Sequence, residues 1–352
     1  MKILYGVCGE GLGHAMRSAV VARHLEGAGH SVTFLSSGRA REHLERGFPR
    51  QVLPIVGLGS VTKNNVVVAG ETLATNLIKQ PLAWAANAPV IARALASRPD
   101  VVVSDFDPIS ARVAALSGCK LIAIDNIHFM NHCAHPTEFV ACNRGAAALM
   151  YPVVQNVVPN AERYLITTFA RAPVLRLRSS LHLPILRPEV LRAKQSTNRP
   201  HIVMYLNDKA DHGQRVAVLK RLGVPVHVYG KKGQSRAERD QNVTLCPLSD
   251  EAFISDLASA SAVIGGAGFA LMTEAIYLGK PMLAVPFGGH FEQILNAEYL
   301  TMLGYGERCR EFSVDVLRGF LERAPRYART LASFEHDGNR SLLLAASQAI
   351  ES

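Results

Sequence analysis

The residues of this sequence that are best suited to chemistry are glycines followed by polar side chains. Gly265, Gly266 and Gly268 come directly after an apolar run that ends at Ile264, and a helix-like run, 269–277, follows them. Backbone N–H groups at a helix N-terminus are free and carry partial positive charge, and glycines let an anion approach them. The pattern predicts a strand, a glycine turn and a helix start that together bind a phosphate group.

The same pattern occurs a second time after the apolar run 282–285. Segment 288–293, with the sequence GGHFEQ, follows this run, and another helix is expected from Ile294 onward. The turns therefore predict a site for a phosphate that carries sugars at both ends. The hydroxyl groups of these sugars would be bound by polar side chains just beyond the turns, which are Glu274, Glu292 and Gln293.

His14 stands at the end of a further glycine-rich loop. The strand expected at 2–7 leads into Gly9, Gly11 and Gly13, and a helix is expected from 15 to 28. The unperturbed pKa of histidine, about 6.5, suits a general base at neutral pH. The sequence therefore predicts that His14 removes a proton from a hydroxyl group, with the alternative that it only holds the loop at the helix start.

Asp105 is the carboxylate expected to orient this histidine. It follows the buried strand expected at 101–104, and Asp107 precedes Pro108, so Asp107 is expected to be a helix N-cap. Asp105 has no such capping role in the predicted structure. Because ligands of parallel sheets bind beyond the carboxyl ends of the strands, Asp105 is placed to contact a ligand or His14. Its alternative role is a cap or an ion pair. Asp125, after the next strand at 121–124, is the alternative partner of His14.

The elements that must position these residues form two α/β domains. A chain of 352 residues is longer than most chains that fold around a single hydrophobic core, and strands are expected to alternate with helices along it. A dinucleotide-binding enzyme is disfavoured, because His14 stands where the Gly-x-Gly-x-x-Gly fingerprint needs glycine or alanine. In addition, the second strand ends in Ser36-Ser37-Gly38-Arg39, which offers no acid for a ribose diol.

Composition and charge exclude other classes of protein. The net charge is +9, but aromatic residues are sparse and no Lys/Arg block stands out, so nucleic acid is not an expected partner. Six scattered cysteines without a C-x-x-C pair fit reduced thiols, and the apolar start 1–9 is too short for a signal peptide. We expect a cytoplasmic protein. Basic, apolar helices within 73–98 suggest weak peripheral association with a membrane surface.

Histidines and cysteines gather in segment 128–142, HFMNHCAHPTEFVAC. His128 and His132 are four residues apart, which is a conceivable metal-ligand spacing. Pro136 interrupts the segment, and the spacing matches no zinc motif. We therefore expect no metal site and predict a loop near the ligand-binding site.

Segment 263–300 resembles the donor-binding segment of GT-B glycosyltransferases. The similarity lies in GGAGFALMTEAIYLGKPMLAVP followed by HFEQILNAEYL, and it is closest to the peptidoglycan N-acetylglucosaminyltransferase and related UDP-glycosyltransferases. Many relatives have a histidine where this chain has Gly266, so backbone amides or another side chain must replace it. The resemblance is weaker in 3–18 and 101–126, and weakest elsewhere.

The resemblance implies specific roles for residues of this chain. The glutamate Glu274 would bind the nucleotide ribose, and Glu292 with Gln293 would bind the donor hexose. Gly11 and Gly13 would line the acceptor side of the first loop, where His14 would be the base. The diphosphate and the rest of the donor would lie against Gly266, Gly268, Phe269, Ala270 and His290.

The resemblance also implies the fold and the reaction. We expect an α/β protein with the GT-B fold, in which two doubly wound Rossmann-like domains face each other across a cleft. The acceptor domain would span 1–182, the nucleotide-sugar domain 183–339, and a C-terminal helix, 340–352, would pack back on the first domain. The predicted function is transfer of a hexose from a nucleotide-sugar, a UDP-sugar by preference, to the hydroxyl of a small-molecule or lipid-linked acceptor.

The reaction is expected to invert the anomeric carbon and to need no metal or cofactor. A base on the acceptor side and no evident nucleophile favour inversion. Backbone amides can stabilise the leaving diphosphate without a metal, and we expect the sequence to lack the Asp-x-Asp triplet that metal-dependent GT-A transferases use. Two alternatives remain from the sequence: a non-hydrolysing sugar-nucleotide 2-epimerase, and a sugar-nucleotide-binding protein without catalysis.

Overall fold

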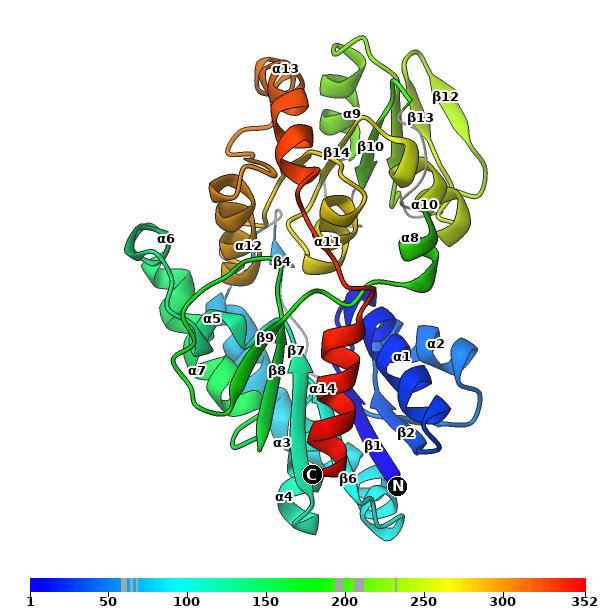
Figure 1. The fold of residues 1–352 in the computed structure, drawn as a ribbon, viewed down its shortest axis with the longest axis vertical. Helices are drawn as coiled ribbons and strands as arrows, with labels where there is room; N and C mark the ends of the chain where they lie inside the picture. Colours follow the sequence, from blue (N-terminus) through cyan, green and yellow to red (C-terminus); the bar gives the residue numbers. More distant parts are fainter. Residues whose placement is uncertain (58–61, 64–65, 68, 194–198, 206–211, 232) are drawn as a thin grey trace. The chain divides into compact units, whose positions relative to one another are not determined.

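The chain divides into two compact units in the computed structural model (Figure 1). The structure describes residues 1–57, 62–63, 66–67, 69–193, 199–205, 212–231 and 233–352, and only the backbone of 62–63, 66–67, 69–81 and 212. Unit 1 comprises Met1–Val61, Val68–Ile185 and Asp337–Ser352, and unit 2 comprises Thr62–Val67 and Leu186–His336. The boundary expected from the sequence, between 182 and 183, lies close to the observed division after Ile185.

Unit 1 is built on a parallel sheet. Its strand order, β3-β2-β1-β6-β7-β8-β9, reverses direction between β1 and β6, as in doubly wound folds. The strands are β1 (Lys2–Val7), β2 (Ser31–Ser36), β3 (Val52–Pro54), β6 (Val101–Asp105), β7 (Lys120–Asp125), β8 (Arg163–Thr167) and β9 (Ser179–His182).

Helices connect these strands and cover the sheet. The C-terminal helix belongs to this unit, because Leu342, Ala346 and Ile350 lie in the same core cluster as the strands. It packs beside α1, where His24 Nε2 lies 3.0 Å from Ser347 Oγ (Figure 1). The helices of unit 1 are α1 (Leu12–Gly27), α2 (Gly38–Gly47), α3 (Ala69–Ala96), α4 (Pro108–Ser117), α5 (Phe129–His132), α6 (Thr137–Ala141), α7 (Arg144–Val157) and α14 (Arg340–Glu351).

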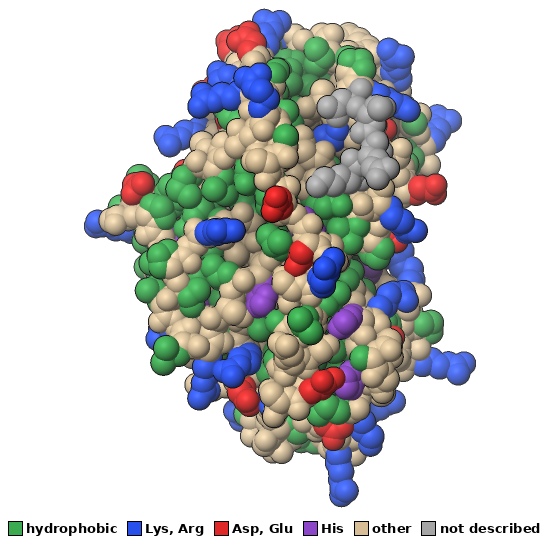
Figure 2. Space-filling view, viewed as in Figure 1, with side chains coloured by type: hydrophobic (Ala, Val, Ile, Leu, Met, Phe, Trp, Pro, Cys, Tyr) green, Lys and Arg blue, Asp and Glu red, His purple; other side chains and the backbone are tan. Residues whose placement is uncertain are grey.

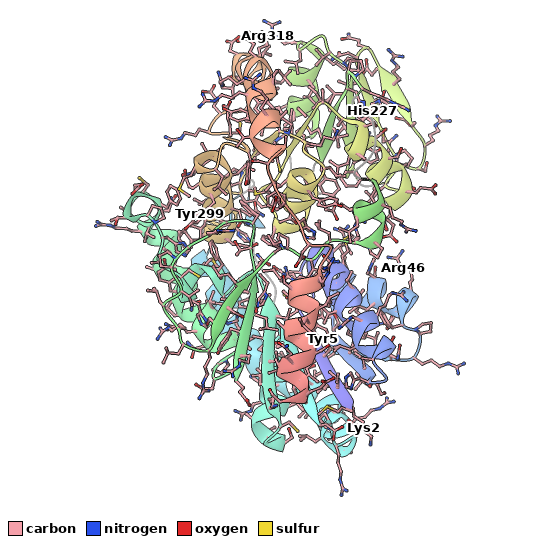
Figure 3. The ribbon with its side chains drawn as sticks, viewed as in Figure 1. Lys2, Tyr5, Arg46, His227, Tyr299 and Arg318 are labelled. Carbon is pink, nitrogen blue, oxygen red and sulfur yellow. The ribbon has the colours of Figure 1, made fainter. Side chains whose placement is uncertain are left out.

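The apolar strands form because both faces of a parallel sheet are buried. Residues 101–105 are all buried, and Tyr5 on β1 stacks on Phe34 of β2 with ring centroids 5.7 Å apart (Figure 3). Asp107 caps α4, as predicted, because its Oδ2 accepts a hydrogen bond from Ser110 N at 2.7 Å. Gly118 ends α4 in the left-handed region.

Unit 2 repeats this architecture. Its sheet has the order β12-β13-β11-β10-β14-β15-β16, parallel except for β12, and again reverses at a central pair, β10 and β14. The strands are β10 (Ile202–Tyr205), β11 (Val226–Tyr229), β12 (Glu238–Asp240), β13 (Val243–Leu245), β14 (Ala262–Gly265), β15 (Met282–Ala284) and β16 (Gly306–Arg308). A separate antiparallel pair, β4 (Thr62–Lys63) and β5 (Val66–Val67), is also assigned to this unit.

The helices of unit 2 begin at recognisable caps. Ser249 caps α10 by accepting a hydrogen bond from Ala252 N, and Ser313 caps α13 in the same way. Tyr299 on α12 is among the largest fully buried side chains (Figure 3). The helices are α8 (Pro188–Ala193), α9 (His212–Lys220), α10 (Asp250–Ser259), α11 (Phe269–Tyr277), α12 (Phe291–Met302) and α13 (Val314–Leu331).

The structure corrects three sequence-based predictions. Helix α1 begins at Leu12 instead of residue 15, so His14 lies in its first turn and not at the end of the loop before it. Segment 128–142 is not a plain loop but contains α5 and α6, since Asp125 Oδ1 accepts a hydrogen bond from His128 N at 2.9 Å and turns the chain into a helix. Helix α12 begins at Phe291 instead of Ile294, because His290 N donates to Phe287 O in the preceding turn. Asn207 and Asp208, expected after β10, lie outside the described residues.

Within the described chain, none of the helices combines the length and apolar character needed to cross a membrane.

Candidate active site

The first candidate site lies where the strand order of unit 1 reverses. Val7, the last residue of β1, pairs with Asp105, the last residue of β6, so the loop after β1 and the end of β6 lie side by side. Gly11 has φ of 83°, a left-handed conformation that favours glycine, and directly precedes α1. Gly13 and His14 then lie in the first turn of α1. The topology thus brings His14 to the end of β6.

Asp105 is the centre of a hydrogen-bond network. Its carboxylate is fully buried, and His14 Nδ1 lies 2.8 Å from its Oδ1. Arg17 donates to the same carboxylate twice, from Nε to Oδ2 at 2.6 Å and from Nη2 to Oδ1 at 2.5 Å. Ser18 Oγ donates to Oδ2 at 3.0 Å. Four groups therefore satisfy a charge that would otherwise be costly to bury.

The charges around Asp105 keep it ionised. Burial by itself would raise the pKa of this carboxyl, but Arg17 and His14 outweigh burial and lower the pKa below its usual value. An ionised carboxylate only accepts hydrogen bonds, so the contact with Asp105 requires a proton on His14 Nδ1, whereas Arg17 Nη2, which can only donate, lies 2.7 Å from the same nitrogen. In the tautomer with its proton on Nδ1, His14, whose side chain is 16% exposed, has a lone pair on Nε2.

The structure pairs Asp125, the alternative partner, with a different histidine. Asp125 Oδ2 lies 2.7 Å from His128 Nδ1, and both side chains are buried. Burial would raise the pKa of Asp125, but His128 and its backbone N–H lower it to about 2. His14 therefore contacts Asp105, while Asp125 belongs to a second, buried His–Asp pair.

Arg17 is the main residue of this site that the sequence reasoning missed. It is 7% exposed, and besides Asp105 its Nη1 donates to Asn126 Oδ1 at 2.5 Å, which joins the ends of β6 and β7. Its Nη2 also lies 2.7 Å from His14 Nδ1. Arg17 stands three residues after His14, a spacing that places both side chains on one face of α1 and could have indicated the contact.

The second candidate site lies at the reversal point of unit 2. Strand β14 ends at Gly265, and α11 begins after Gly268, which caps it without a side-chain hydrogen bond. Neither Gly266 nor Gly268 has a positive φ, and a Cβ built on either would meet no atom within 4 Å. By contrast, a Cβ on Gly265 would lie 2.7 Å from Leu271 Cδ2. Neither conformation nor packing requires glycine at 266 and 268, and the open space beside them would let a ligand approach the amides of α11.

Gly266→Ala therefore tests the turn directly. Because the added Cβ meets open space, we expect the free energy of unfolding to change by less than about 0.5 kcal/mol. We expect UDP to bind about tenfold more weakly or worse, because the methyl group would occupy the approach to the amides. Calorimetry with UDP and with uridine makes the comparison: uridine lacks the diphosphate, so its affinity should not change. Equal losses for both ligands would contradict phosphate binding at this turn.

Glu274 lies on α11 but is held by another side chain. It is 5% exposed, and Arg187 donates to both of its carboxylate oxygens, from Nε at 2.8 Å and from Nη2 at 3.0 Å. Burial raises the pKa of Glu274 despite this pairing. Arg187 could not be recognised as this partner from the sequence, because it precedes Glu274 by 87 residues. Binding of a ribose by Glu274 stays a prediction, and would use oxygen lone pairs that Arg187 leaves.

The other residues predicted to bind the donor lie at the starts of α11 and α12 and differ in burial and in hydrogen bonding. Phe269 is buried in the first turn of α11, and Ala270 is half-buried beside it. Gln293 Oε1 accepts a hydrogen bond from Phe287 N at 3.0 Å, so its carbonyl holds the preceding loop and its amide NH₂ is the group left to meet a ligand. His290 is the N-cap of α12, and its Nδ1 is buried without a hydrogen-bond partner. Glu292 lies in the first turn of α12.

The sequence contains an Asp-x-Asp triplet that the prediction of metal independence overlooked. Asp105 and Asp107 flank Phe106, which is the spacing of the GT-A metal site. The expectation that the sequence lacks such a triplet is therefore wrong. In the structure Asp105 is bound by Arg17, and Asp107 caps α4 at 2% exposure. These carboxylates are already satisfied, so they do not form an open pair of metal ligands.

A set of three potential metal ligands does occur among the described residues, far along the chain from these sites. It consists of His201, His227 and Asp256. Their polar atoms are bonded to one another or to the backbone: His227 Nδ1 lies 2.7 Å from Asp256 Oδ2, and His201 Nε2 lies 3.1 Å from Asp256 O. Tyr229 donates to the same carboxylate at 2.6 Å. These three residues and Tyr229 form a hydrogen-bond network within unit 2.

The two doubly wound units and their strand-end sites define a GT-B glycosyltransferase fold, which solved structures share over the length of the chain. The spinosyn forosaminyltransferase SpnP matches with a TM-score of 0.66 and 16% identity, covering 100% of both chains. VinC in complex with DTDP matches with a TM-score of 0.63 at 16% identity, again over 100% of both chains. Acinetobacter baumannii MurG matches with a TM-score of 0.59 at 16% identity, over 99% of each chain.

The family follows from the sequence itself. The profile of glycosyl transferase family 1 matches residues 1–325, and the chain belongs to this family. An uncharacterized glycosyltransferase of Methanosarcina mazei is 25% identical over 346 residues, which cover 87% of this chain and 85% of the relative. One from Methanosarcina acetivorans is 24% identical over 339 residues, with the same coverage. The predicted fold class and enzyme class are confirmed, and the protein is a glycosyltransferase.

Proposed function

We propose that this glycosyltransferase moves a hexose from a nucleotide-sugar, specifically a UDP-sugar, to an acceptor hydroxyl group. The observation that carries the proposal is the hydrogen bond between His14 Nδ1 and the ionised Asp105, at 2.8 Å. An imidazole that donates from Nδ1 to this carboxylate keeps a lone pair on Nε2, which a general base requires. The glycine turn before α11 supports the donor half of the proposal, because its amides suit a diphosphate.

The proposed reaction is a single displacement. His14 Nε2 takes the proton of the acceptor hydroxyl as the oxygen attacks the anomeric carbon. The bond from that carbon to the diphosphate breaks, and its electron pair leaves with the diphosphate, whose growing charge is stabilised by the amides of α11. Attack from the side opposite the leaving group inverts the anomeric carbon. NMR of the product's anomeric proton distinguishes inversion from retention.

Transfer is expected to need no divalent metal. The described glycine turn offers backbone amides to the diphosphate, and the Asp-x-Asp triplet is occupied by protein partners. Activity measured in excess chelator should therefore persist. The control is the same assay with added magnesium or manganese. Complete loss in chelator, restored by either ion, would show that a metal performs this role.

Gln293 is proposed to contact the donor hexose through its amide NH₂. Gln293→Glu keeps an oxygen that can accept the hydrogen bond from Phe287 N, so the loop should hold, but it removes the NH₂ donor. We expect weaker discrimination between UDP-hexoses, with the affinity for free UDP changed much less. Calorimetry with UDP and two epimeric UDP-hexoses measures both quantities. An equal loss for all three ligands would refute contact with the hexose.

The acceptor is proposed to be a small molecule or a lipid-linked molecule bound by unit 1. The expected membrane association of the 73–98 region stays a prediction, and the side chains of 73–81 lie outside the described residues. Screening nucleotide-sugars for thermal stabilisation tests the donor class, since a ligand that binds the native state raises Tm. UDP-hexoses should stabilise the protein more than nucleoside diphosphates of other bases. No stabilisation by any nucleotide-sugar would overturn the proposal.

A further inference from the structure

The outer face of helix α7 is apolar between the exposed Arg144 at its start and the exposed Gln155 and Asn156 near its end. Gly145, Ala148, Leu149 and Pro152 are exposed, and their i, i+3, i+4, i+7 spacing places them on one side of the helix. Leu149 is 42% exposed, while Ala147, Val154 and Val157 bury the opposite side. A helix of a globular domain normally turns polar residues to water, so this outer face lacks the partner that its composition suits.

The segment between β8 and β9 exposes three more large apolar side chains. Val174 is 41% exposed, Leu175 is 61% exposed and Leu177 is 106% exposed. The backbone here is fixed, because Leu175 N donates to His132 O at 2.7 Å and Ala134 N donates to Pro173 O at 2.8 Å. The leucines are therefore presented from an anchored segment.

The two surfaces belong to the same side of unit 1. Helix α5 contacts α7, and the 173–175 segment is bonded to the residues at the end of α5. Figure 2 shows hydrophobic side chains gathered on the side of unit 1 where Figure 1 draws α6 and α7. We call this surface the α7–loop patch and define it by Gly145, Ala148, Leu149, Pro152, Val174, Leu175 and Leu177.

The sequence around the patch is strongly basic. Between the exposed Glu138 and the end of this part of unit 1 at Ile185, the sequence contains one acidic residue, Glu162, and five arginines. Arg176 and Arg178 flank the exposed Leu177 in the sequence, Arg171 precedes Val174 by three residues, and all three arginines are exposed. Leucine and arginine alternate over 175–178, so each apolar side chain has a positive charge next to it.

We propose that the α7–loop patch docks unit 1 on an anionic phospholipid surface. A bilayer of this kind offers apolar chains to the leucines and negative headgroups to the arginines, and each arginine near such a surface strengthens binding. Nucleic acid would satisfy the arginines but leave the leucines exposed. A second copy of the chain would bring two positive patches together. The proposal is independent of the donor and the reaction, because the binding needs no substrate.

Sedimentation with vesicles tests the patch. The full-length protein is mixed with phosphatidylcholine vesicles or with vesicles that also contain phosphatidylglycerol, at low and high salt. Wild-type protein should bind the anionic vesicles, and less so at high salt, because salt screens the arginines. The double variant Leu175→Ser/Leu177→Ser and the double variant Arg176→Gln/Arg178→Gln should each lower the partition coefficient about tenfold or more.

Leu116→Ser is the matched control, since Leu116 is a 55% exposed leucine on α4, outside the patch. It should leave vesicle binding unchanged, and all variants should keep the wild-type Tm because the substituted side chains are exposed. Equal binding to neutral and anionic vesicles, or a leucine variant that binds like wild type, would overturn the proposal. So would a wild-type dimer that the leucine variants dissociate without any vesicle binding, since the patch would then join two copies.

Discussion

His14→Ala is expected to lower kcat by roughly 100-fold or more, the usual contribution of a positioned general base. It should leave the affinity for UDP almost unchanged, because the turn proposed to bind the diphosphate lies in unit 2 and His14 in unit 1. Steady-state kinetics and calorimetry measure the two quantities. His24→Ala is the matched control, since His24 is on the same helix but bonds to Ser347. It should keep kcat.

Asp105→Asn extends this test. The asparagine leaves Arg17 without its anion and 2.7 Å from His14 Nδ1, so positive charge on the imidazole is opposed as the proton arrives. We expect kcat to fall here too. The double variant with His14→Ala should be little worse than His14→Ala alone, because the pair acts as a unit. If the two losses multiply, or if His14→Ala abolishes UDP binding, the assignment of the pair is wrong.

Arg17→Met is expected to lower the free energy of unfolding at neutral pH by about 3–5 kcal/mol, the usual cost of removing one partner of a buried ion pair. The methionine keeps most of the side-chain length, so the loss reports the uncompensated charge of Asp105. Denaturant unfolding measures it. Arg46→Met, at an exposed position of α2, is the control and should change stability by less than about 0.5 kcal/mol (Figure 3).

The pH dependence of this loss has a defined sign. In the wild type the pKa of Asp105 is lowered by folding, so its contribution to stability is present above the ordinary carboxyl pKa, about 4, and is lost as pH falls below it. In Arg17→Met burial should raise that pKa, so the folded variant takes up a proton as pH falls from 7. The difference between the two proteins should therefore shrink toward pH 4. A difference below 1 kcal/mol, or one that does not change with pH, would contradict the role of Arg17.

Local signals in the sequence were sufficient to predict the strands that position His14 and Asp105. Apolar runs that end in polar residues located β1, β6 and β7, and the parallel sheet then requires their ends to meet, which brought His14 and Asp105 together. Asp107 before Pro108 was recognisable as a cap because both residue types have fixed preferences at a helix start. These predictions depend on chemistry within a few residues of chain.

The partners of the buried charges could not be predicted in the same way. Arg17 would ordinarily be assigned to the solvent side of α1, and it is buried because Asp105, 88 residues later, neutralises it. Arg187 and Glu274 are likewise 87 residues apart. A sequence pattern shows that such a residue is charged, but not which opposite charge a long connection will bring to it. The earlier start of α12 was missed because His290 lacks a typical cap side chain.

The most direct test of the central claim is release of UDP from UDP-hexoses, measured with and without candidate acceptor alcohols and with analysis of the sugar product. The account predicts that UDP appears in step with an acceptor glycoside, and that both fall together in His14→Ala. Conversion of the UDP-sugar into its C2 epimer without a glycoside would indicate an epimerase instead. Stable binding of the UDP-sugar with neither UDP nor glycoside formed, across acceptors of both proposed classes, would contradict catalysis.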